Sequence, residues 1–206
     1  FPEVAPNLID RYIVACADAE IPALLVLNKA DLIKKNDPIL NLMKEYQALG
    51  YEVMQTQSDG DLTELANRLA GETVAFVGQS GVGKSSLINA MVPDAAQKTN
   101  IISENSALGQ HTTTSTRLIA FGEGAALIDS PGIREFGLWH LNPDKVQQGF
   151  PEIENLLGHC QFRNCTHKHE KQCALRQAAA NGEILQRRLD SYLRLSDEIA
   201  EAQQKN

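Results

Sequence analysis

The chain has 206 residues, of which 43% are hydrophobic and 22% charged, and its formal net charge is −7. This composition is that of a globular protein and argues against wholesale disorder. It also argues against nucleic-acid binding by bulk electrostatics, because 26 acidic residues outnumber 19 Lys and Arg. The longest apolar run, residues 21–27, contains a proline and is far shorter than the roughly twenty residues of a membrane span, so no membrane insertion is expected.

Apolar periodicity and turn residues predict alternating helices and strands up to about residue 137. In one helix, at 37–48, Asp37 can serve as N-cap, Pro38 as the first residue, and Gly50 lies beyond the end. The other helices are expected at 8–19, at 61–70 (with Asp61 and Glu64 in a capping pattern) and at 84–91. The strands are expected at 23–27 (buried on both faces), 51–56, 73–77, 117–121 and 125–128, with a polar loop at 93–114.

This alternation predicts an α/β fold, a three-layer sandwich in which helices cover both faces of a mostly parallel sheet. After residue 137 the strand signals stop, and a helix expected at about 183–203 follows a cysteine cluster. We therefore expect two domains, an α/β domain at 1–139 and a small helical domain at 140–206.

A glycine-rich motif gives the clearest chemical signal. Residues 78–85 match the P-loop pattern GxxxxGK[ST] between a predicted strand and a predicted helix. Glycines let backbone N–H groups wrap a phosphate, Lys84 would neutralise the β- and γ-phosphates, and the Ser85 hydroxyl would bind Mg²⁺. The residues expected to bind phosphate are Gly78, Gln79, Ser80, Gly81, Val82, Gly83, Lys84, Ser85 and Ser86.

A DxxG motif, Asp129 to Gly132, follows the strand expected at 125–128. An aspartate at that position can hold Mg²⁺ through water, and the glycine can donate its N–H to a γ-phosphate. The pattern alone is weak, but after a P-loop it favours a nucleotide site.

An NKxD motif, Asn28-Lys29-Ala30-Asp31, follows the strand expected at 23–27. The Asp31 carboxylate can accept two hydrogen bonds from guanine, a pair of donors that adenine does not offer. Asn28 can join loops and reach the base, and the Lys29 stem would cover its face. Asp31 could instead serve as a helix N-cap, but the three motifs together favour guanine recognition.

These motifs form the GTPase set in an unusual order, because NKxD precedes the P-loop and DxxG. A circular permutation explains this order, and a fold tolerates one when its original ends lie close together.

The series NKAD, GQSGVGKSS, GQHTTT, DSPG and C-x4-C-x-H-x5-C resembles the RsgA/YjeQ family, circularly permuted GTPases stimulated by the small ribosomal subunit. LIDRY at 8–12 and REFGLWHL at 134–141 also look like that family, so the resemblance covers the whole chain. The family's N-terminal OB-fold domain would precede Phe1, and the sequence is expected to be a fragment. The resemblance implies a cytoplasmic, monomeric protein that binds the small ribosomal subunit and its rRNA during late maturation.

The resemblance also implies a switch segment. The family's switch I threonines match residues 112–114, after His111. Thr113 is expected to complete Mg²⁺ coordination when a γ-phosphate is present, with the threonine before it as the next candidate. His111 is the candidate that orients the attacking water, because Ile133 stands where Ras-like enzymes carry a glutamine. In the loop that supports guanine, Ser58 would contribute only a backbone N–H.

Cys160, Cys165, His167 and Cys173 form a Cys₃His set suited to one tetrahedral zinc ion. Four protein ligands leave no open position, which predicts a structural and not a catalytic metal. An odd number of clustered cysteines beside histidines favours metal ligation over disulfides, and therefore a reducing compartment.

Several alternatives remain around this cluster. His159 and His169 are rivals of His167, which the family pattern selects, and the cysteines could also be free buried thiols. Residues 140–206 have few apolar residues near the cluster for a core of their own, which favours a metal staple. The nearby basic side chains form either a local patch for RNA phosphates or an ordinary solvated surface; they are Arg163, Lys168, Lys171, Arg176, Arg187 and Arg188.

The expected function is GTP hydrolysis by attack of water on the γ-phosphate, coupled to small-subunit maturation as the family resemblance implies. Lys84, Thr113 and Mg²⁺ held at Ser85 would stabilise the developing charge. One alternative is a GTP-gated RNA-binding scaffold in which hydrolysis only resets the state. Another is an ATP-dependent P-loop kinase, against which Asp31 argues.

Overall fold

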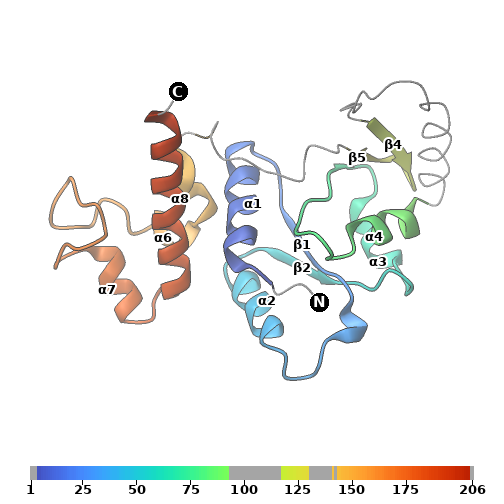
Figure 1. Ribbon diagram of the computed structural model, residues 1–206, viewed down its shortest axis with the longest axis horizontal. Coiled ribbons are helices and arrows are strands. Elements are labelled where there is room, and N and C mark those ends of the chain that lie inside the picture. The colour runs from blue at the N-terminus through green and yellow to red at the C-terminus, as the bar shows by residue number, and fades with distance from the viewer. Residues whose placement is uncertain (1–3, 93–116, 130–140, 142, 205–206) are drawn as a thin grey trace. The chain divides into compact units, whose positions relative to one another are not determined.

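A computed structural model describes residues 4–92, 117–129, 141 and 143–204 of the chain. Contacts between Cα atoms divide the chain into two compact units, whose elements are labelled in Figure 1. The first unit comprises Phe1–Val4 and Leu24–Glu135, and the second comprises Ala5–Ala23 and Phe136–Asn206. A boundary at 139 would group residues 5–23 with the α/β part instead, and it stays a prediction.

The first unit contains five described strands in two hydrogen-bonded groups (Figure 1). β1 (Leu24–Leu27) pairs in parallel with β2 (Glu52–Gln55). β3 (Thr73–Val74) pairs in parallel with β5 (Ala125–Asp129), which pairs antiparallel with β4 (Arg117–Phe121). Each expected strand is present, although β3 has only two residues. The pairing is mostly parallel, as predicted.

The helical segments of the first unit alternate with these strands. They are the 3₁₀-helix η1 (Ala30–Leu32), α2 (Pro38–Ala48), α3 (Thr63–Leu69) and α4 (Lys84–Met91). Asp37 caps α2 as predicted, because its carboxylate accepts a hydrogen bond of 3.0 Å from the backbone N–H of Ile39.

The start of α3 differs from the prediction. The N-cap residue is Leu62, and Asp61 lies one position earlier. The Asp61 carboxylate still accepts a hydrogen bond of 2.8 Å from the N–H of Thr63, so it satisfies a donor of the first turn from outside the helix.

A small apolar core joins strands and helices of the first unit. Met54 of β2, Leu65 and Leu69 of α3, and Leu87 of α4 are its buried members. Side chains of β1 and β3 pack against them. In β1 only Leu27 is fully buried and the other three residues are half-buried, so the expectation of a strand buried on both faces is wrong for the described residues.

The regular elements among the described residues of the second unit are all helical, and residues 155–173 between two of them form turns and loops. Its elements are α1 (Pro6–Asp18), η3 (Pro143–Gly149), α6 (Pro151–Glu154), α7 (Ala174–Ala180) and α8 (Gln186–Gln204). The helices expected at 8–19 and 183–203 are therefore confirmed. Among the described residues of either unit, no helix combines the length and the apolar character needed to cross a bilayer.

The second unit has a substantial core, contrary to the expectation from its sequence. Phe150, Ile153, Leu175 and Leu195 are fully buried in it, and Val14 of α1 joins them. α1 approaches η3 so closely that a Cβ atom on Gly149 would lie 2.9 Å from the Cα of Val14. The cysteine cluster adjoins this core: Cys173 belongs to it, and Cys160 and Cys165 pack against it.

A buried ion pair also ties α1 to α8. The guanidinium of Arg188 donates to a carboxylate oxygen of Asp10 at 2.6 Å, and both side chains are inaccessible to solvent. It also donates to Glu152 at 2.6 Å and lies 4.2 Å from the centroid of the Phe150 ring. Burial disfavours the charge, but the hydrogen bonds and charges of the two acids outweigh burial and raise the pKa of Arg188. Arg188 therefore fits neither interpretation of the basic residues: it is not part of an RNA-binding patch, and it does not lie on a solvated surface.

Candidate nucleotide site and metal cluster

The nucleotide motifs follow the carboxyl ends of strands in the first unit. β1 ends directly before Asn28, and β2 ends directly before Thr56. β3 leads toward Gly78, and its parallel neighbour β5 ends at Asp129. Because parallel neighbours end at the same edge of a sheet, each pair brings two predicted motifs together, and ligands of open α/β sheets bind at such edges.

Asn28 joins three separate segments. Its amide Nδ2 donates to the carbonyl oxygen of Val82 at 3.1 Å, and it lies 3.4 Å from both the Gly83 carbonyl and the Ser58 hydroxyl. Its Oδ1 accepts a hydrogen bond of 3.2 Å from the hydroxyl of Thr56. The predicted ability of Asn28 to join loops is thus observed: it connects the NKxD motif to the P-loop and to the loop of Ser58.

Only glycine fits at position 83. Its φ is 92°, a left-handed conformation that residues with a Cβ rarely adopt. A Cβ atom there would also lie 2.5 Å from the amide nitrogen of Asn28. Gly83 therefore lets α4 begin while the NKxD loop approaches the P-loop backbone.

Two lysines direct their ammonium groups to the P-loop. Lys84 donates to the carbonyl oxygens of Gly78 and Gln79, at 2.6 and 2.8 Å. Lys29, whose φ of 60° is also left-handed, donates to the carbonyl oxygen of Gly81 at 2.8 Å. The positive charge therefore lies at the loop that is predicted to wrap phosphates, and the predicted role of the Lys29 stem over a base stays a prediction.

The remaining described residues of the site differ in exposure. Asp31, Ser85 and Ser86 are exposed, and Ser58 is half-buried. Asp31 lies within η1, whose N-cap residue is Lys29, and α2 is capped by Asp37. The alternative reading of Asp31 as a helix N-cap is therefore wrong.

Part of the predicted site lies outside the described residues. His111, Thr113 and Gly132 belong to these segments, and for Asp129 only the backbone at the end of β5 is described. Their roles stay predictions.

Thr56 is a site residue that the sequence reasoning missed. It is buried, its carbonyl oxygen accepts from the N–H of Ala30 at 3.0 Å, and its N–H donates to the carbonyl of Leu27 at 2.9 Å. With its hydroxyl on Asn28 it holds the NKxD loop by two hydrogen bonds and the end of β1 by a third. The sequence feature that could have indicated this role is the position of Thr56 at the end of the strand that follows the NKxD segment.

In the second unit, Cys160, Cys165, His167 and Cys173 come together. Their four ligand atoms all lie within 4.8 Å of one another. The Nδ1 of His167 lies 3.3 Å from the sulfur of Cys173, and the sulfurs of Cys160 and Cys173 are 3.9 Å apart. Ligands 2.0–2.3 Å from a tetrahedral zinc would be separated by about 3.3–3.8 Å, so the donor set and its geometry fit zinc.

Without a metal, burial acts in opposite ways on the two kinds of ligand in this cluster. Burial, with a contribution from the neighbouring thiols, raises the pKa of Cys165 to about 12. Burial lowers the pKa of His167, which favours the neutral imidazole that a metal binds. A divalent cation would reverse the penalty on the thiolates, so metal binding and deprotonation are coupled at this cluster.

Glu170 stabilises the loop between the cluster's ligands, and no pattern in the sequence indicated this role. Its carboxylate accepts hydrogen bonds from the N–H and the hydroxyl of Thr166, at 2.7 and 2.8 Å, and from the N–H of His169 at 3.1 Å. These bonds flank His167, which has a left-handed φ of 62°. The donors of Thr166 lower the pKa of Glu170 to about 2.

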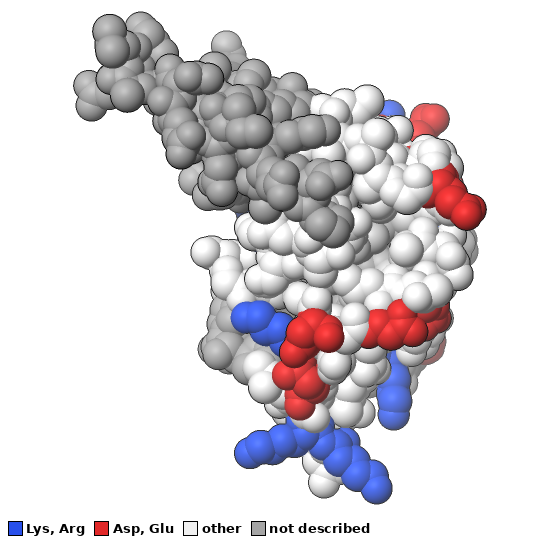
Figure 2. All heavy atoms as spheres, turned by 90° about the vertical axis from the view of Figure 1, so that its right-hand side faces the viewer, with Lys and Arg blue, Asp and Glu red and all other residues white. Residues whose placement is uncertain are grey.

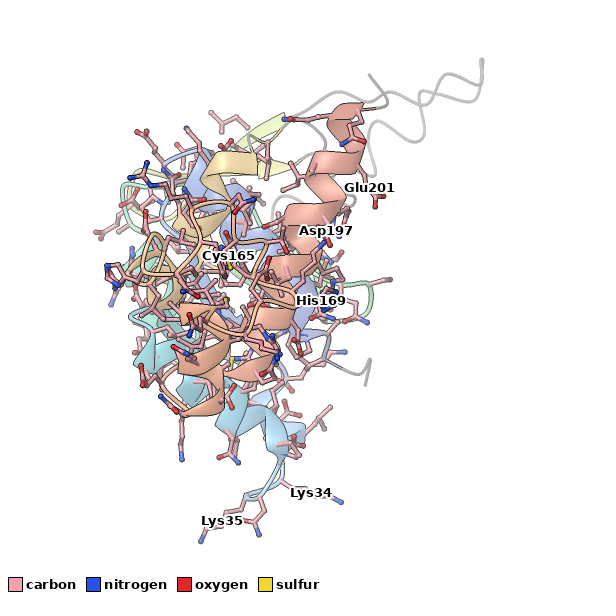
Figure 3. The ribbon with its side chains drawn as sticks, turned by 90° about the vertical axis from the view of Figure 1, so that its left-hand side faces the viewer. Lys34, Lys35, Cys165, His169, Asp197 and Glu201 are labelled. Carbon is pink, nitrogen blue, oxygen red and sulfur yellow. The ribbon has the colours of Figure 1, made fainter. Side chains whose placement is uncertain are left out.

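The rival histidines lie outside the four-residue group. His159 and His169 are both exposed. Figure 3 labels His169 and Cys165 beside α8, which carries Asp197. The neighbouring Lys168 donates to Asp197 at 2.7 Å, so this cation is already paired.

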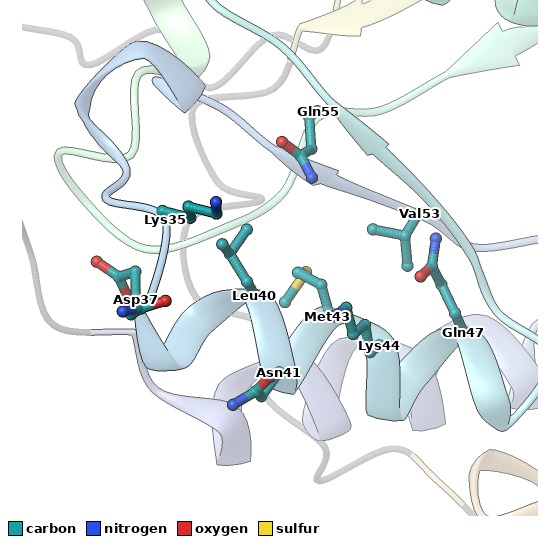
Figure 4. Close-up of a pocket in the computed structure, with 10 residues that line it drawn as sticks. Lys35, Asp37, Leu40, Asn41, Met43, Lys44, Gln47, Val53 and Gln55 are labelled. Atoms are coloured by element: carbon teal, nitrogen blue, oxygen red, sulfur yellow. The ribbon is translucent and has the colours of Figure 1, made fainter.

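A separate pocket of about 520 Å³ lies between α2 and β2 (Figure 4). Its lining combines the apolar Leu40, Met43 and Val53 with polar groups that include Lys35 and Lys44. The residues that line it do not include any from the P-loop or from NKxD, so this pocket is not the predicted nucleotide site.

Comparison with known proteins gives consistent matches. A family model described as RsgA GTPase matches residues 1–139. The chain is 45% identical over 207 residues to a protein of Yersinia pseudotuberculosis described as small ribosomal subunit biogenesis GTPase RsgA, and 47% identical over 204 residues to one of Haemophilus influenzae with the same description. These matches cover 98% and 97% of the chain. The chain spans 59% of the length of each of these curated relatives.

Solved structures agree in fold. The crystal structure of YjeQ from Thermotoga maritima matches with a TM-score of 0.77 and 29% identity, over 97% of this chain and 68% of that one. YloQ, described as a circularly permuted GTPase, matches with a TM-score of 0.75 and 30% identity, over 97% of this chain and 64% of that one. The predicted fold class, a permuted GTPase α/β fold followed by a helical part with a Cys₃His cluster, is therefore confirmed.

Proposed function

The chain belongs to the RsgA GTPase family. We propose that it hydrolyses GTP to GDP and phosphate as a step in the maturation of the small ribosomal subunit. The activity would be coupled to binding of the small ribosomal subunit and its rRNA, in the cytoplasm and as a monomer. The observation that best supports this proposal is the junction at Asn28, which draws the base-reading motif onto the phosphate-binding loop.

Each residue of the site has a role in this proposal. The guanine edge would be bound by the exposed carboxylate of Asp31, and the phosphates by the backbone N–H groups of the P-loop and the ammonium of Lys84. Ser85, Asp129 and Thr113 would hold Mg²⁺, which supplies charge neutralisation at the phosphates.

Hydrolysis requires an oriented water and stabilised charge on the γ-phosphate. Lys84 would stabilise that charge, His111 would orient the water, and Gly132 would donate its N–H to the γ-phosphate. Cys160, Cys165, His167 and Cys173 would hold one structural zinc ion, because four protein ligands leave no position for a substrate.

The test is GTP turnover by this chain with and without purified small ribosomal subunits. The proposal predicts slow turnover alone, stimulation by small subunits, and loss of the stimulated rate in Lys84→Ala. Turnover that small subunits leave unchanged would contradict it and would favour the alternative of a GTP-gated RNA-binding scaffold. Stronger binding of ATP than of GTP would instead support the P-loop kinase.

A further inference from the structure

The metal-cluster segment carries an exposed aromatic side chain. Phe162 lies between the ligands Cys160 and Cys165, and 52% of its surface is accessible. The other exposed large hydrophobic side chains in the described part of the chain are all aliphatic. Packing of a partner against Phe162 would remove its apolar surface from water. This burial would contribute favourable binding free energy.

The fold of the loop presents this ring at a turn. The N–H of Cys165 donates to the carbonyl oxygen of Phe162 at 3.2 Å, and the N–H of Gln161 donates to the carbonyl oxygen of Gln172 at 3.3 Å. Both ends of the turn are cysteines of the cluster. Metal binding would therefore fix the turn at both ends and hold the Phe162 ring at its tip.

The surroundings of this turn are basic although the chain is acidic. Residues 158–176 contain four Lys and Arg and one acid, Glu170, whereas the whole chain has a net charge of −7. The carboxylate of Glu170 is engaged by Thr166 and His169. Figure 2 shows a face of the first unit that carries groups of both acidic and basic side chains among the described residues.

Two exposed cations belong to the segments that meet at this turn. Arg163 follows Phe162 directly, and Lys171 precedes Gln172, which the hydrogen bond to Gln161 brings to the turn. Lys168 and Arg176 are engaged elsewhere, by Asp197 and by the Glu170 carbonyl oxygen. The turn thus combines an exposed aromatic ring with cations suited to phosphates.

We propose that the turn formed by residues 161–164 binds single-stranded RNA, with a nucleobase stacked on Phe162 and flanking phosphates at Arg163 and Lys171. Aromatic rings and guanidinium planes are the usual platforms for unstacked bases, and every base offers a π-face, so the site would tolerate many sequences. The inference rests on the proposed function, because it supplies an RNA contact for a small-subunit partner. It goes beyond that function by naming the residue and the strandedness of the RNA.

The experiment uses the full chain loaded with zinc and fluorescence anisotropy of labelled RNA. The probes are single-stranded oligoadenylate, single-stranded oligouridylate and a blunt-ended duplex of two complementary RNA strands, each titrated at several salt concentrations. Phe162→Ala should weaken binding to both single strands about tenfold or more and leave the salt dependence unchanged, since stacking involves no counterion release. Phe162→Trp should retain binding.

Matched variants separate stacking from charge. Arg163→Gln should weaken binding and reduce the salt slope by about one phosphate contact. Leu185→Ala, which truncates another exposed hydrophobic side chain of the same unit, should change nothing. Zinc content, measured for each variant, should stay at the wild-type value.

Unchanged affinity of Phe162→Ala for single strands would overturn the proposal, and so would an equal loss for the duplex, which offers no unstacked base. If Phe162→Ala keeps its affinity for RNA but no longer binds intact small subunits, the proposal is also overturned, because Phe162 would then contact ribosomal protein. Failure of small subunits to stimulate turnover, with Phe162-dependent RNA binding intact, would reject the proposed function alone.

Discussion

Asn28 donates a hydrogen bond of 3.1 Å to the carbonyl oxygen of Val82, across 54 positions of sequence. The bond joins the first nucleotide motif in the chain to the second. In this permuted chain the two motifs are consecutive, and the contact brings them together in the fold.

Asn28→Ala should therefore lower GTP affinity without removing any group that is predicted to touch phosphate. The substitution removes the bonds to Val82 and Thr56, so the NKxD loop is no longer held at the P-loop. Because the Asn28 amide is part-buried and has several hydrogen-bond partners, we expect its loss to lower GTP affinity about tenfold. The measurement is titration with a fluorescent GTP analogue, with the exposed Asn67→Ala as matched control; equal affinities in the two variants would contradict the expectation.

Arg188→Met should destabilise the second unit by about 3–5 kcal/mol, because it removes the hydrogen-bonded cation of the buried Asp10 carboxylate and leaves only the more distant Arg187 at 3.9 Å. The control is Arg194→Met, an exposed position on the same helix. Urea unfolding would measure both. A loss in Arg188→Met no larger than in the control would mean that the buried ion pair contributes little.

The burial of Arg188 shows that a basic residue near a predicted patch need not lie on the surface. Helix α8 and its extent were predictable from periodicity, and so was the cap of α2, because Asp37 and Pro38 are adjacent local signals. The burial of Arg188 depends on Asp10, which lies 178 positions away. Its spacing from Leu195 and Ile199 does place it on the buried face, a signal that a count of basic residues overlooks.

The candidate site divides in the same way. Contiguous motifs located the P-loop, NKxD and the Cys₃His set, because each needs fixed residue types at fixed spacing. Such motifs could not identify Thr56 and Glu170, because both act through hydrogen bonds with backbone groups that only the folded chain brings close to them. The grouping of α1 with the C-terminal helices also depends on tertiary contacts, such as those of Gly149 with Val14.

Glu170→Gln should weaken zinc binding by about 10- to 100-fold, the usual cost of losing a residue that orients metal ligands. The carboxylate holds the backbone on both sides of His167, and the amide would replace one of its acceptor oxygens with a donor. Chelator competition and the absorption spectrum of the Co²⁺-substituted protein would measure the effect. Exposed Glu154→Gln is the control, and equal zinc affinities would contradict the role of Glu170.

The pKa of about 2 at Glu170 also predicts a pH dependence. A carboxyl whose pKa is lower in the folded than in the unfolded state stabilises the fold above its ordinary value of 4.5, and this stabilisation is lost as pH falls from there toward 2. In metal-free protein the melting temperature should therefore fall over this window. The Glu170→Gln variant should show a smaller fall, and identical pH profiles would contradict the lowered pKa.

The permuted motifs are proposed to form a site that recognises guanine, and Asp31→Asn removes the carboxylate that would bind the base. The change replaces a carboxylate acceptor by an amide that can donate to the 2-oxo group of xanthine. Affinities of the wild type and the variant for GTP, ATP and xanthosine triphosphate should show that the wild type prefers GTP. The variant should lose about tenfold or more in GTP affinity and gain in affinity for the xanthine nucleotide. A variant that keeps wild-type GTP affinity and gains nothing for xanthosine triphosphate would contradict the account.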